Sequence, residues 1–247
     1  MSWVALALLL AAFGWSLRRD PLGRRRFAGL PPAAARIARY RYWLGRAALG
    51  WGLSGLVALA LTGRLAAMVT VPAEFEPFRT LLSLGPGRRY GPDVMAEAAL
   101  GGVAGAVIGG VLLTLLTRHR GPGEQVMLGR VSPILPRSRR ELGWAALLSL
   151  QAGVVEELYF RLALPLAIAD VTGSALAGHG VATLMFGLAH RYQRWVGMLA
   201  TTVMGAVLAL LYLGSGALWL AMAVHVATNS IGIVLRPALA GAWRVRP

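Results

Sequence analysis

The chain contains no cysteine, no lysine and few charged residues of any kind among its 247 residues. Without cysteine there is no disulfide, no thiolate metal site and no cysteine nucleophile. Charged residues make up 14% of the sequence, whereas a soluble globular domain carries about 25%. Hydrophobic residues account for 57% and occur in long blocks. These proportions exclude a soluble domain, because helices that are apolar on every side leave no face for water.

The hydrophobic blocks have the length of transmembrane helices, because about 20 residues cross a ~30 Å hydrocarbon core. We predict an all-α polytopic bundle of about seven transmembrane helices, within a range of six to eight. It divides into an N-terminal three-helix region (1–141) and a four-helix core (142–240) within one integrated membrane domain. The predicted spans are 2–17, 44–69, 95–116, 142–169, 174–190, 195–213 and 217–235.

The basic residues are unevenly distributed along the chain, whose formal net charge is +15. All 25 are arginine, and 20 of them fall in the segments 18–46, 118–140, 191–194 and 236–247. This positive-inside asymmetry places the N-terminus outside and the C-terminus in the cytoplasm, and it argues against nucleic acid as a partner. Arginines follow the first block rather than precede it, so we expect an uncleaved first helix. The absence of lysine, with abundant alanine, glycine and arginine, points to a GC-rich prokaryotic genome and an inner-membrane protein.

Two features of the N-terminal region predict how it packs. Gly101, Gly105 and Gly109 share one face of the third span, and this spacing lets a neighbouring helix approach closely. Arg64 lies near the outer end of the second span, where we expect it to extend to the membrane surface. The basic segment 118–140 is suited to lie on anionic lipid.

Polar and ionisable residues inside the membrane are concentrated in the last four spans. Such residues are costly in lipid and mark functional sites. They are Glu156, Glu157, Arg161, His190, His225 and Asn229.

The two adjacent glutamates have different expected partners. Glu157 and Arg161 are four residues apart on one helix face, which predicts a buried ion pair. Glu156 points about 100° away and has no partner in its own helix. A buried carboxylate without a partner has a raised pKa, as a general base near neutral pH requires. The alternative is a salt-bridge cluster that only locks helices together.

The two histidines each have a neighbour one turn away. Phe186 precedes His190 on the same face and is expected to pack against the imidazole. Asn229 follows His225 in the middle of the seventh span. Two neutral donors projecting from one helix suit a developing oxyanion. The alternative interpretation of His225 and Asn229 is an interhelical hydrogen bond.

These three motifs, in this order on late apolar helices, resemble one family of membrane enzymes. Adjacent glutamates with an arginine four residues after the second, then Phe-x-x-x-His, then His-x-x-x-Asn, are similar to the CPBP family. This family comprises the type II CAAX prenyl endopeptidases and the bacteriocin-processing enzymes, and is also called Abi. The resemblance covers residues 142–235.

The resemblance implies an intramembrane endopeptidase with its site in a cavity between helices. By analogy, Glu156 and His190 activate a water molecule, while His225 and Asn229 hold the oxyanion. Glu157, Arg161 and Phe186 support them. The implied substrate is a membrane-associated protein or peptide, either lipid-modified or a peptide precursor.

The resemblance leaves the role of a metal open, since both metal-dependent and glutamate-dependent mechanisms have been argued for the family. Glu156, His190 and His225 could supply a zinc site with an open position. The His-Glu-x-x-His signature is absent. We therefore expect no required cofactor.

Other functions fit the sequence less well than an endopeptidase. Gly52, Ser54 and Gly55 resemble the serine motif of rhomboid proteases, although the motif order does not fit. Aspartyl intramembrane proteases are excluded, because no aspartate lies in the middle of a span. A non-catalytic membrane scaffold or bacteriocin-immunity protein would keep the fold without turnover. A transporter would favour broken helices in repeated halves, whereas the polar residues here lie in one half.

Overall fold

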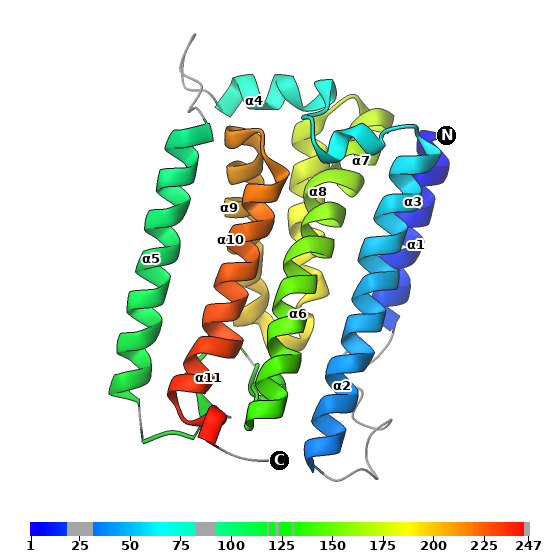
Figure 1. The fold of residues 1–247 in the computed structure, drawn as a ribbon. Coiled ribbons are helices and arrows are strands. Elements are labelled where there is room, and N and C mark those ends of the chain that lie inside the picture. The colour runs from blue at the N-terminus through cyan, green and yellow to red at the C-terminus, as the bar shows by residue number, and fades with distance from the viewer. Residues whose placement is uncertain (19–31, 83–91, 118, 122–123, 130, 245–247) are drawn as a thin grey trace.

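The computed structural model of the chain describes residues 1–18, 32–82, 92–117, 119–121, 124–129 and 131–244. Within these ranges every regular element is a helix, which confirms the all-α prediction (Figure 1). The first rods of the bundle are α1 (Ser2–Arg18), α2 (Pro32–Ala47) continuing through a π-helix (Ala48–Leu53) into α3 (Ser54–Leu61), and α5 (Pro92–Leu116). In the next rod α6 (Arg139–Glu157) continues through a π-helix (Leu158–Ala163) into α7 (Leu164–Thr172). The rods α8 (Ala175–Ala189) and α9 (Arg194–Ser215) follow. In the last rod α10 (Leu218–Ser230) continues through a π-helix (Ile231–Leu235) into α11 (Arg236–Leu239). Shorter elements are α4 (Glu76–Leu82) and the 3₁₀-helices Leu65–Met68, Ala73–Phe75, Ser132–Ile134, Arg191–Gln193 and Ala242–Arg244.

Four of the rods have the length and apolar character of membrane helices, and the rod formed by α6 and α7 is not one of them. Four helical stretches of the described chain are long and apolar enough to cross a bilayer, and α1 and α8 are shorter apolar helices. The rod formed by α6 and α7 carries three of the ionisable residues predicted for the last four spans. The four stretches are Pro32–Leu61, Asp93–Leu116, Arg191–Ser215 and Leu218–Leu239.

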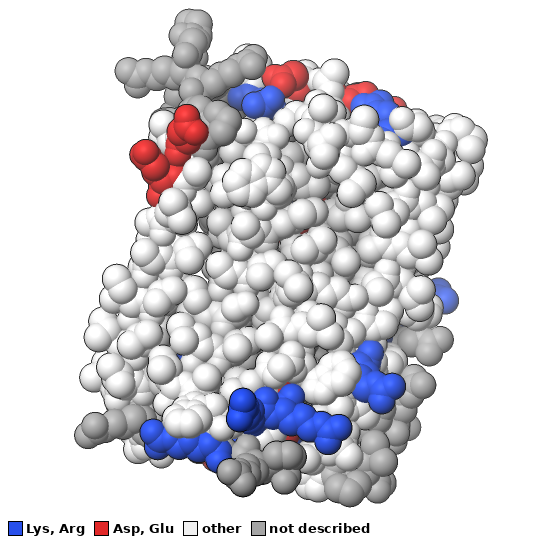
Figure 2. Space-filling view, in the orientation of Figure 1, with Lys and Arg blue, Asp and Glu red and all other residues white. Residues whose placement is uncertain are grey.

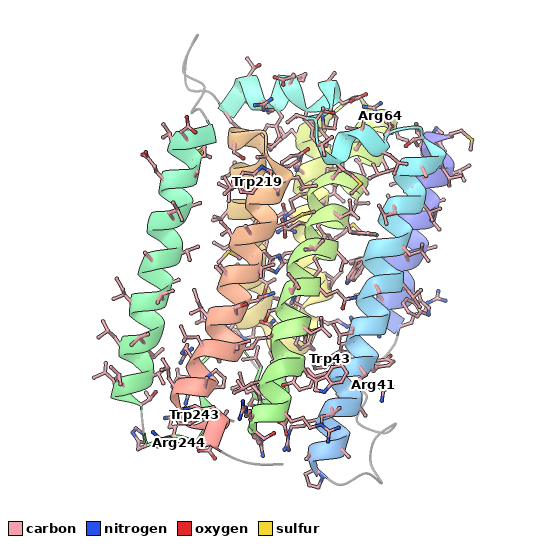
Figure 3. All side chains as sticks on the ribbon, viewed as in Figure 1. Arg41, Trp43, Arg64, Trp219, Trp243 and Arg244 are labelled. Atoms are coloured by element: carbon pink, nitrogen blue, oxygen red, sulfur yellow. The ribbon has the colours of Figure 1, made fainter. Side chains whose placement is uncertain are left out.

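Charge and tryptophan are arranged as a bilayer requires. On the face in Figure 2, charged side chains gather at the two ends and leave a wide uncharged band between them. Trp43 and Trp243 lie at one end with Arg41 and Arg244, and Trp219 lies near the other end (Figure 3). Tryptophan at both boundaries of an apolar band is typical of the interfacial belts of membrane proteins. The chain is thus a helical integral membrane protein.

Which end of the bundle faces the cytoplasm stays a prediction. The start of α1 and Arg244 lie at opposite ends (Figures 1 and 3). Of the basic segment 18–46, residues 19–31 lie outside the described residues.

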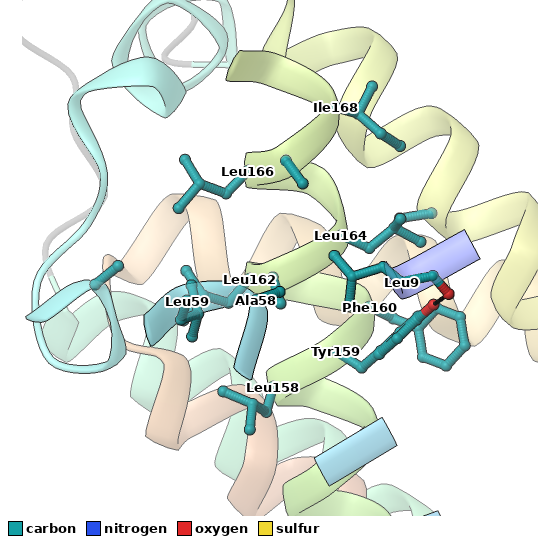
Figure 4. Packing of buried hydrophobic residues seen from close by; sticks show 14 of the residues in the cluster. Leu9, Ala58, Leu59, Leu158, Tyr159, Phe160, Leu162, Leu164, Leu166 and Ile168 are labelled. Carbon is teal, nitrogen blue, oxygen red and sulfur yellow. Dashed lines mark hydrogen bonds between the residues drawn. The ribbon is translucent and has the colours of Figure 1, made fainter. Parts of the chain in front are cut away.

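The π-helix Leu158–Ala163 lies at the centre of the core. All six of its residues are buried. Tyr159 donates a hydrogen bond of 2.6 Å to the carbonyl of Leu9 in α1, and on the other side of the π-helix Leu162 lies beside Leu59 in the same buried cluster (Figure 4). A π-helix changes the helix register locally and is frequent at functional sites. This core therefore fixes the direction in which the end of α6 presents its side chains.

The second rod begins and ends earlier than predicted. It starts at Pro32 rather than at residue 44, because its arginines favour a helix and Arg36 makes two hydrogen bonds to the buried Glu141, of 2.8 and 2.9 Å. It ends at Leu61 rather than at residue 69, since Gly63 adopts φ +68°, a left-handed conformation that stops a helix. Arg64 consequently lies beyond the helix, at the end of the bundle, where it pairs with Glu74 (Figure 3).

The glycine face predicted for the third span has no neighbouring helix within the described part of the chain. A Cβ atom added at Gly101, Gly105 or Gly109 would meet no described atom within 4 Å, whereas one added at Gly110 would lie 3.1 Å from Ile231. Helix α5 therefore packs through the face that contains Gly110. A repeated glycine spacing alone does not show which face contacts a neighbouring helix. The predicted outer loop 70–94 also contains α4, which lies across the end of the bundle (Figure 1).

Candidate active site

The end of α6 carries a buried ion pair. Glu157 is fully buried and Arg161 is 1% exposed, with Glu157 Oε2 3.0 Å from Arg161 Nε. Arg161 also donates to the carbonyl of Gly205 at 3.3 Å, and its guanidinium lies 4.2 Å from the ring centre of Phe186. The predicted pairing of Glu157 with Arg161 is confirmed.

Glu157 has a second partner, in α10, that the sequence did not predict. Its Oε1 lies 2.6 Å from Nδ1 of His225. An ionised carboxylate only accepts hydrogen bonds, so we assign the proton of the neutral imidazole to Nδ1. The other ring nitrogen, Nε2, is then unprotonated and lies 3.9 Å from Glu156 Oε2. Glu157 thus orients His225 towards the adjacent glutamate.

Close packing of α6 against α10 makes this contact possible. A Cβ atom at Gly153 would lie 2.5 Å from Cγ2 and 2.8 Å from the backbone nitrogen of Val226. Only glycine permits this approach, one turn before Glu157 and next to His225. Gly153 therefore sets the separation of the two helices that carry most of the ionisable groups.

His190 terminates α8, as predicted, and is held by the preceding turn. Its Nδ1 lies 2.9 Å from the carbonyl oxygen of Phe186. The ring of Phe186 lies 4.8 Å from the ring of His190 and 5.9 Å from that of His225. The predicted packing of Phe186 on His190 is confirmed, and Phe186 also contacts the second histidine.

A cavity of about 210 Å³ brings together three of the four candidate catalytic residues. Glu156, His190 and Asn229 all line it. His225 is not among the lining residues; it is 5% exposed, and its Nε2 lies 3.9 Å from Oε2 of Glu156. The side chain of Glu156 is 13% exposed, so the carboxylate is sheltered but open to a small space. Trp51, Glu156 and Ile233 line the cavity from three different rods. Each of these rods contains a π-helix.

Much of the cavity wall comes from the N-terminal rods, which the sequence pattern does not connect to the site. No motif marks these residues, since tryptophan and arginine near a membrane boundary are common in any membrane protein. From α1 and the second rod the wall contains Ser16, Leu17, Trp43, Arg46, Ala47 and Trp51. From the segment after His190 it contains Arg191, Tyr192 and Gln193.

The side chains do not fit the zinc site that the resemblance allowed. Among the described residues, no group of three or more His, Asp or Glu side chains is arranged to hold a metal ion. Because Nδ1 of His225 is engaged by Glu157, only its Nε2, which lies 3.9 Å from Glu156, is free to act as a ligand. Whether activity requires a metal stays a prediction, and the mechanism proposed below has no step that passes through one.

The rhomboid-like serine does not reach this cavity. Ser54 is buried, and its hydroxyl donates 2.6 Å to the carbonyl of Gly50. Gly52 and Gly55 face Val155 and Leu158, where a Cβ atom would lie at 3.2 and 3.6 Å. These residues therefore serve to pack the second rod against the end of α6.

The comparisons agree with the motifs. Residues 138–231, which extend from the start of α6 into the π-helix after α10, match the family model of the type II CAAX prenyl endopeptidase Rce1-like proteins. No curated protein and no solved structure matches the chain. The match confirms the resemblance over this segment and supports, in general, an intramembrane endopeptidase of the CAAX type with a membrane-associated protein substrate.

Proposed function

We propose that this membrane protein, whose residues 138–231 match the Rce1-like endopeptidases, hydrolyses a peptide bond of a membrane-associated protein or peptide in a prokaryotic inner membrane. The substrate is lipid-modified or a peptide precursor. One observation carries the proposal: Glu156, His190 and Asn229 line a single cavity, with His225 Nε2 3.9 Å from Glu156. This arrangement combines a sheltered carboxylate, imidazole groups and an amide donor at one small space.

In this mechanism Glu156 is the general base. It accepts a proton from a water molecule, whose oxygen forms a bond to the scissile carbonyl carbon. Because the carbonyl oxygen of Phe186 only accepts hydrogen bonds, we assign the proton of neutral His190 to Nδ1, which leaves Nε2 as an acceptor that positions the same water. When the carbon–nitrogen bond breaks, protonated Glu156 delivers its proton to the leaving amine nitrogen.

The oxyanion of the tetrahedral intermediate is stabilised by donors from α10. The amide of Asn229 donates directly. Neutral His225 carries no hydrogen on Nε2, so it donates to the oxyanion only after it has taken up a second proton from solvent, and the carboxylate of Glu157 beside Nδ1 stabilises that cation. Arg161 in turn balances the charge of Glu157, so the buried pair supports catalysis without touching the substrate.

The proposal is tested by cleavage assays on purified protein in lipid vesicles. The substrates are a fluorogenic prenylated CAAX peptide and a library of membrane-anchored peptides whose products are identified by mass spectrometry. Glu156→Gln should lower the cleavage rate by about 10²- to 10⁴-fold, because it removes the general base. Glu97→Gln, at the exposed start of α5, is the matched control and should cleave at the wild-type rate.

Two results would contradict the proposal. Equal cleavage by wild type and Glu156→Gln would show that another group, or a contaminant, hydrolyses the peptide. No cleavage of any peptide by folded wild type would instead favour the non-catalytic membrane scaffold.

A further inference from the structure

Two cations line the candidate catalytic cavity and have no part in the mechanism above. Arg46 comes from α2, and Arg191 comes from the short 3₁₀-helix that follows His190. They share the cavity with Glu156, which is its one acidic lining residue in the described chain. Surplus positive charge in a small sheltered space indicates affinity for an anion.

Both guanidinium groups are hydrogen-bonded to the end of α1. Arg46 donates from NH2 to the carbonyl of Ser16, and Arg191 donates from NH2 to the carbonyl of Leu17. Consecutive carbonyl groups of one helical turn lie only a few ångströms apart. Arg46 is further fixed by its contacts with the Tyr42 hydroxyl at 3.2 Å and the Trp15 ring centre at 5.3 Å.

Capping of α1 explains part of this arrangement, because a helix C-terminus favours cations. It does not explain why two like charges converge on the cavity. Among the described residues, no carboxylate lies within 4.0 Å of either guanidinium group. A guanidinium has five N–H donors in a planar fork that matches a carboxylate, and most donors of these two arginines have no partner in the described part of the chain.

We propose that Arg46 and Arg191 form a carboxylate-binding subsite that holds an anionic group of the substrate peptide beside the scissile bond. The inference rests on the proposed function and adds a requirement for the substrate. The carboxylate belongs either to the C-terminus of the peptide or to an aspartate or glutamate side chain. The aromatic rings of Trp43, Trp51 and Tyr192, which line the same cavity, pack against the neutral residues between this anion and the cleaved bond.

The test compares three fluorogenic peptides that share one cleavable core. The first ends in a carboxylate, the second in a carboxamide, and the third in a carboxamide with aspartate as its last residue. For each enzyme variant we compare kcat/KM between the anionic and neutral peptides, since such a ratio does not depend on the amount of folded protein. Wild type should prefer an anionic peptide by roughly tenfold or more, as expected for a charge-assisted hydrogen bond.

The variants assign the preference to the two arginines. In Arg46→Gln/Arg191→Gln the ratio should fall close to one, while each single variant lies between. Arg41→Gln is the matched control, because Arg41 is exposed on the same helix and does not line the cavity. If only the first peptide is cleaved faster than the neutral second peptide, the subsite binds the C-terminal carboxylate. If the third peptide is also cleaved faster than the second, the subsite binds an acidic side chain.

Two outcomes would overturn the inference. The first is that wild type cleaves anionic and neutral peptides with equal kcat/KM. The second is that Arg46→Gln/Arg191→Gln still prefers the anionic peptides. If wild type cleaves none of the peptides, the proposed function fails separately. In that case, binding of the fluorescent peptides to Glu156→Gln, measured by anisotropy, gives the same comparison between anionic and neutral peptides.

Discussion

Glu157 Oε1 lies 2.6 Å from Nδ1 of His225 and joins two helices whose paired residues are 68 positions apart in the sequence. The other oxygen of the same carboxylate contacts Arg161. Glu157 is therefore the residue that connects the structural ion pair to the imidazole at the candidate active site.

Replacing Glu157 by glutamine should affect turnover more than substrate binding. The amide is neutral, so it no longer stabilises protonated His225 when the oxyanion forms. We expect kcat to fall by about 10²- to 10⁴-fold with KM nearly unchanged, measured on the folded fraction of the protein. Glu141→Gln is the control, because Glu141 is equally buried but pairs with Arg36. It should lose thermal stability and keep its kcat, whereas an unchanged kcat in Glu157→Gln would refute the positioning role.

Close packing at Gly153 gives a second prediction. Gly153→Ala places a methyl group 2.5 Å from Val226 Cγ2 and 2.8 Å from its backbone nitrogen, so α6 and α10 must separate. Overpacking of this kind costs about 1–3 kcal/mol, and we expect a lower thermal midpoint together with a lower kcat. Gly101→Ala, with no described atom within 4 Å, should instead keep its activity and gain up to about 1 kcal/mol from helix propensity. Equal midpoints for the two variants would contradict the close approach of α6 and α10.

The pair formed by Arg64 and Glu74, at the end of the bundle opposite Arg244, predicts a small pH dependence of stability. The hydrogen bond from Arg64 lowers the pKa of Glu74 below its ordinary value of 4.5. The pair therefore stabilises the fold above that value, and this contribution is lost as the pH falls through the lowered pKa. Both side chains are about one third exposed, so the effect at neutral pH should be only about 0.2–1 kcal/mol.

The measurement is the thermal midpoint of wild type, Glu74→Gln and Arg64→Gln across the acid range. Both variants should lie slightly below wild type at pH 7, and the three curves should converge at low pH. If the difference in thermal midpoint between wild type and the variants grows as the pH falls, the pair does not lower the pKa of Glu74 as described.

Local relationships were predictable from the sequence because helix periodicity fixes them. The pairing of Glu157 with Arg161 and the packing of Phe186 on His190 each follow from a spacing of four residues. The helical type of the long elements follows from the apolar blocks in the same way.

Long-range relationships were not predictable, since periodicity does not say which helices are neighbours. The contact between Glu157 and His225, the two hydrogen bonds from Arg36 to Glu141, and the carbonyl contacts of Arg46 all join distant segments. For the same reason the glycine face of Gly101 predicted a partner helix that the described chain does not supply.

The central claim is that α6 presents Glu156 to a water-accessible cavity rather than to lipid. The absence of cysteine makes a direct measurement simple, because single cysteines can be introduced into the natural chain. Leu148, Ala152 and Glu156 line the cavity at a spacing of four residues, while Leu147, Leu150 and Val154 are exposed on the outer surface of the same helix. In lipid vesicles, a charged water-soluble thiol reagent should modify cysteine at positions 148, 152 and 156 and leave positions 147, 150 and 154 unreacted. Modification of the second set with protection of the first would place Glu156 against lipid and contradict the account.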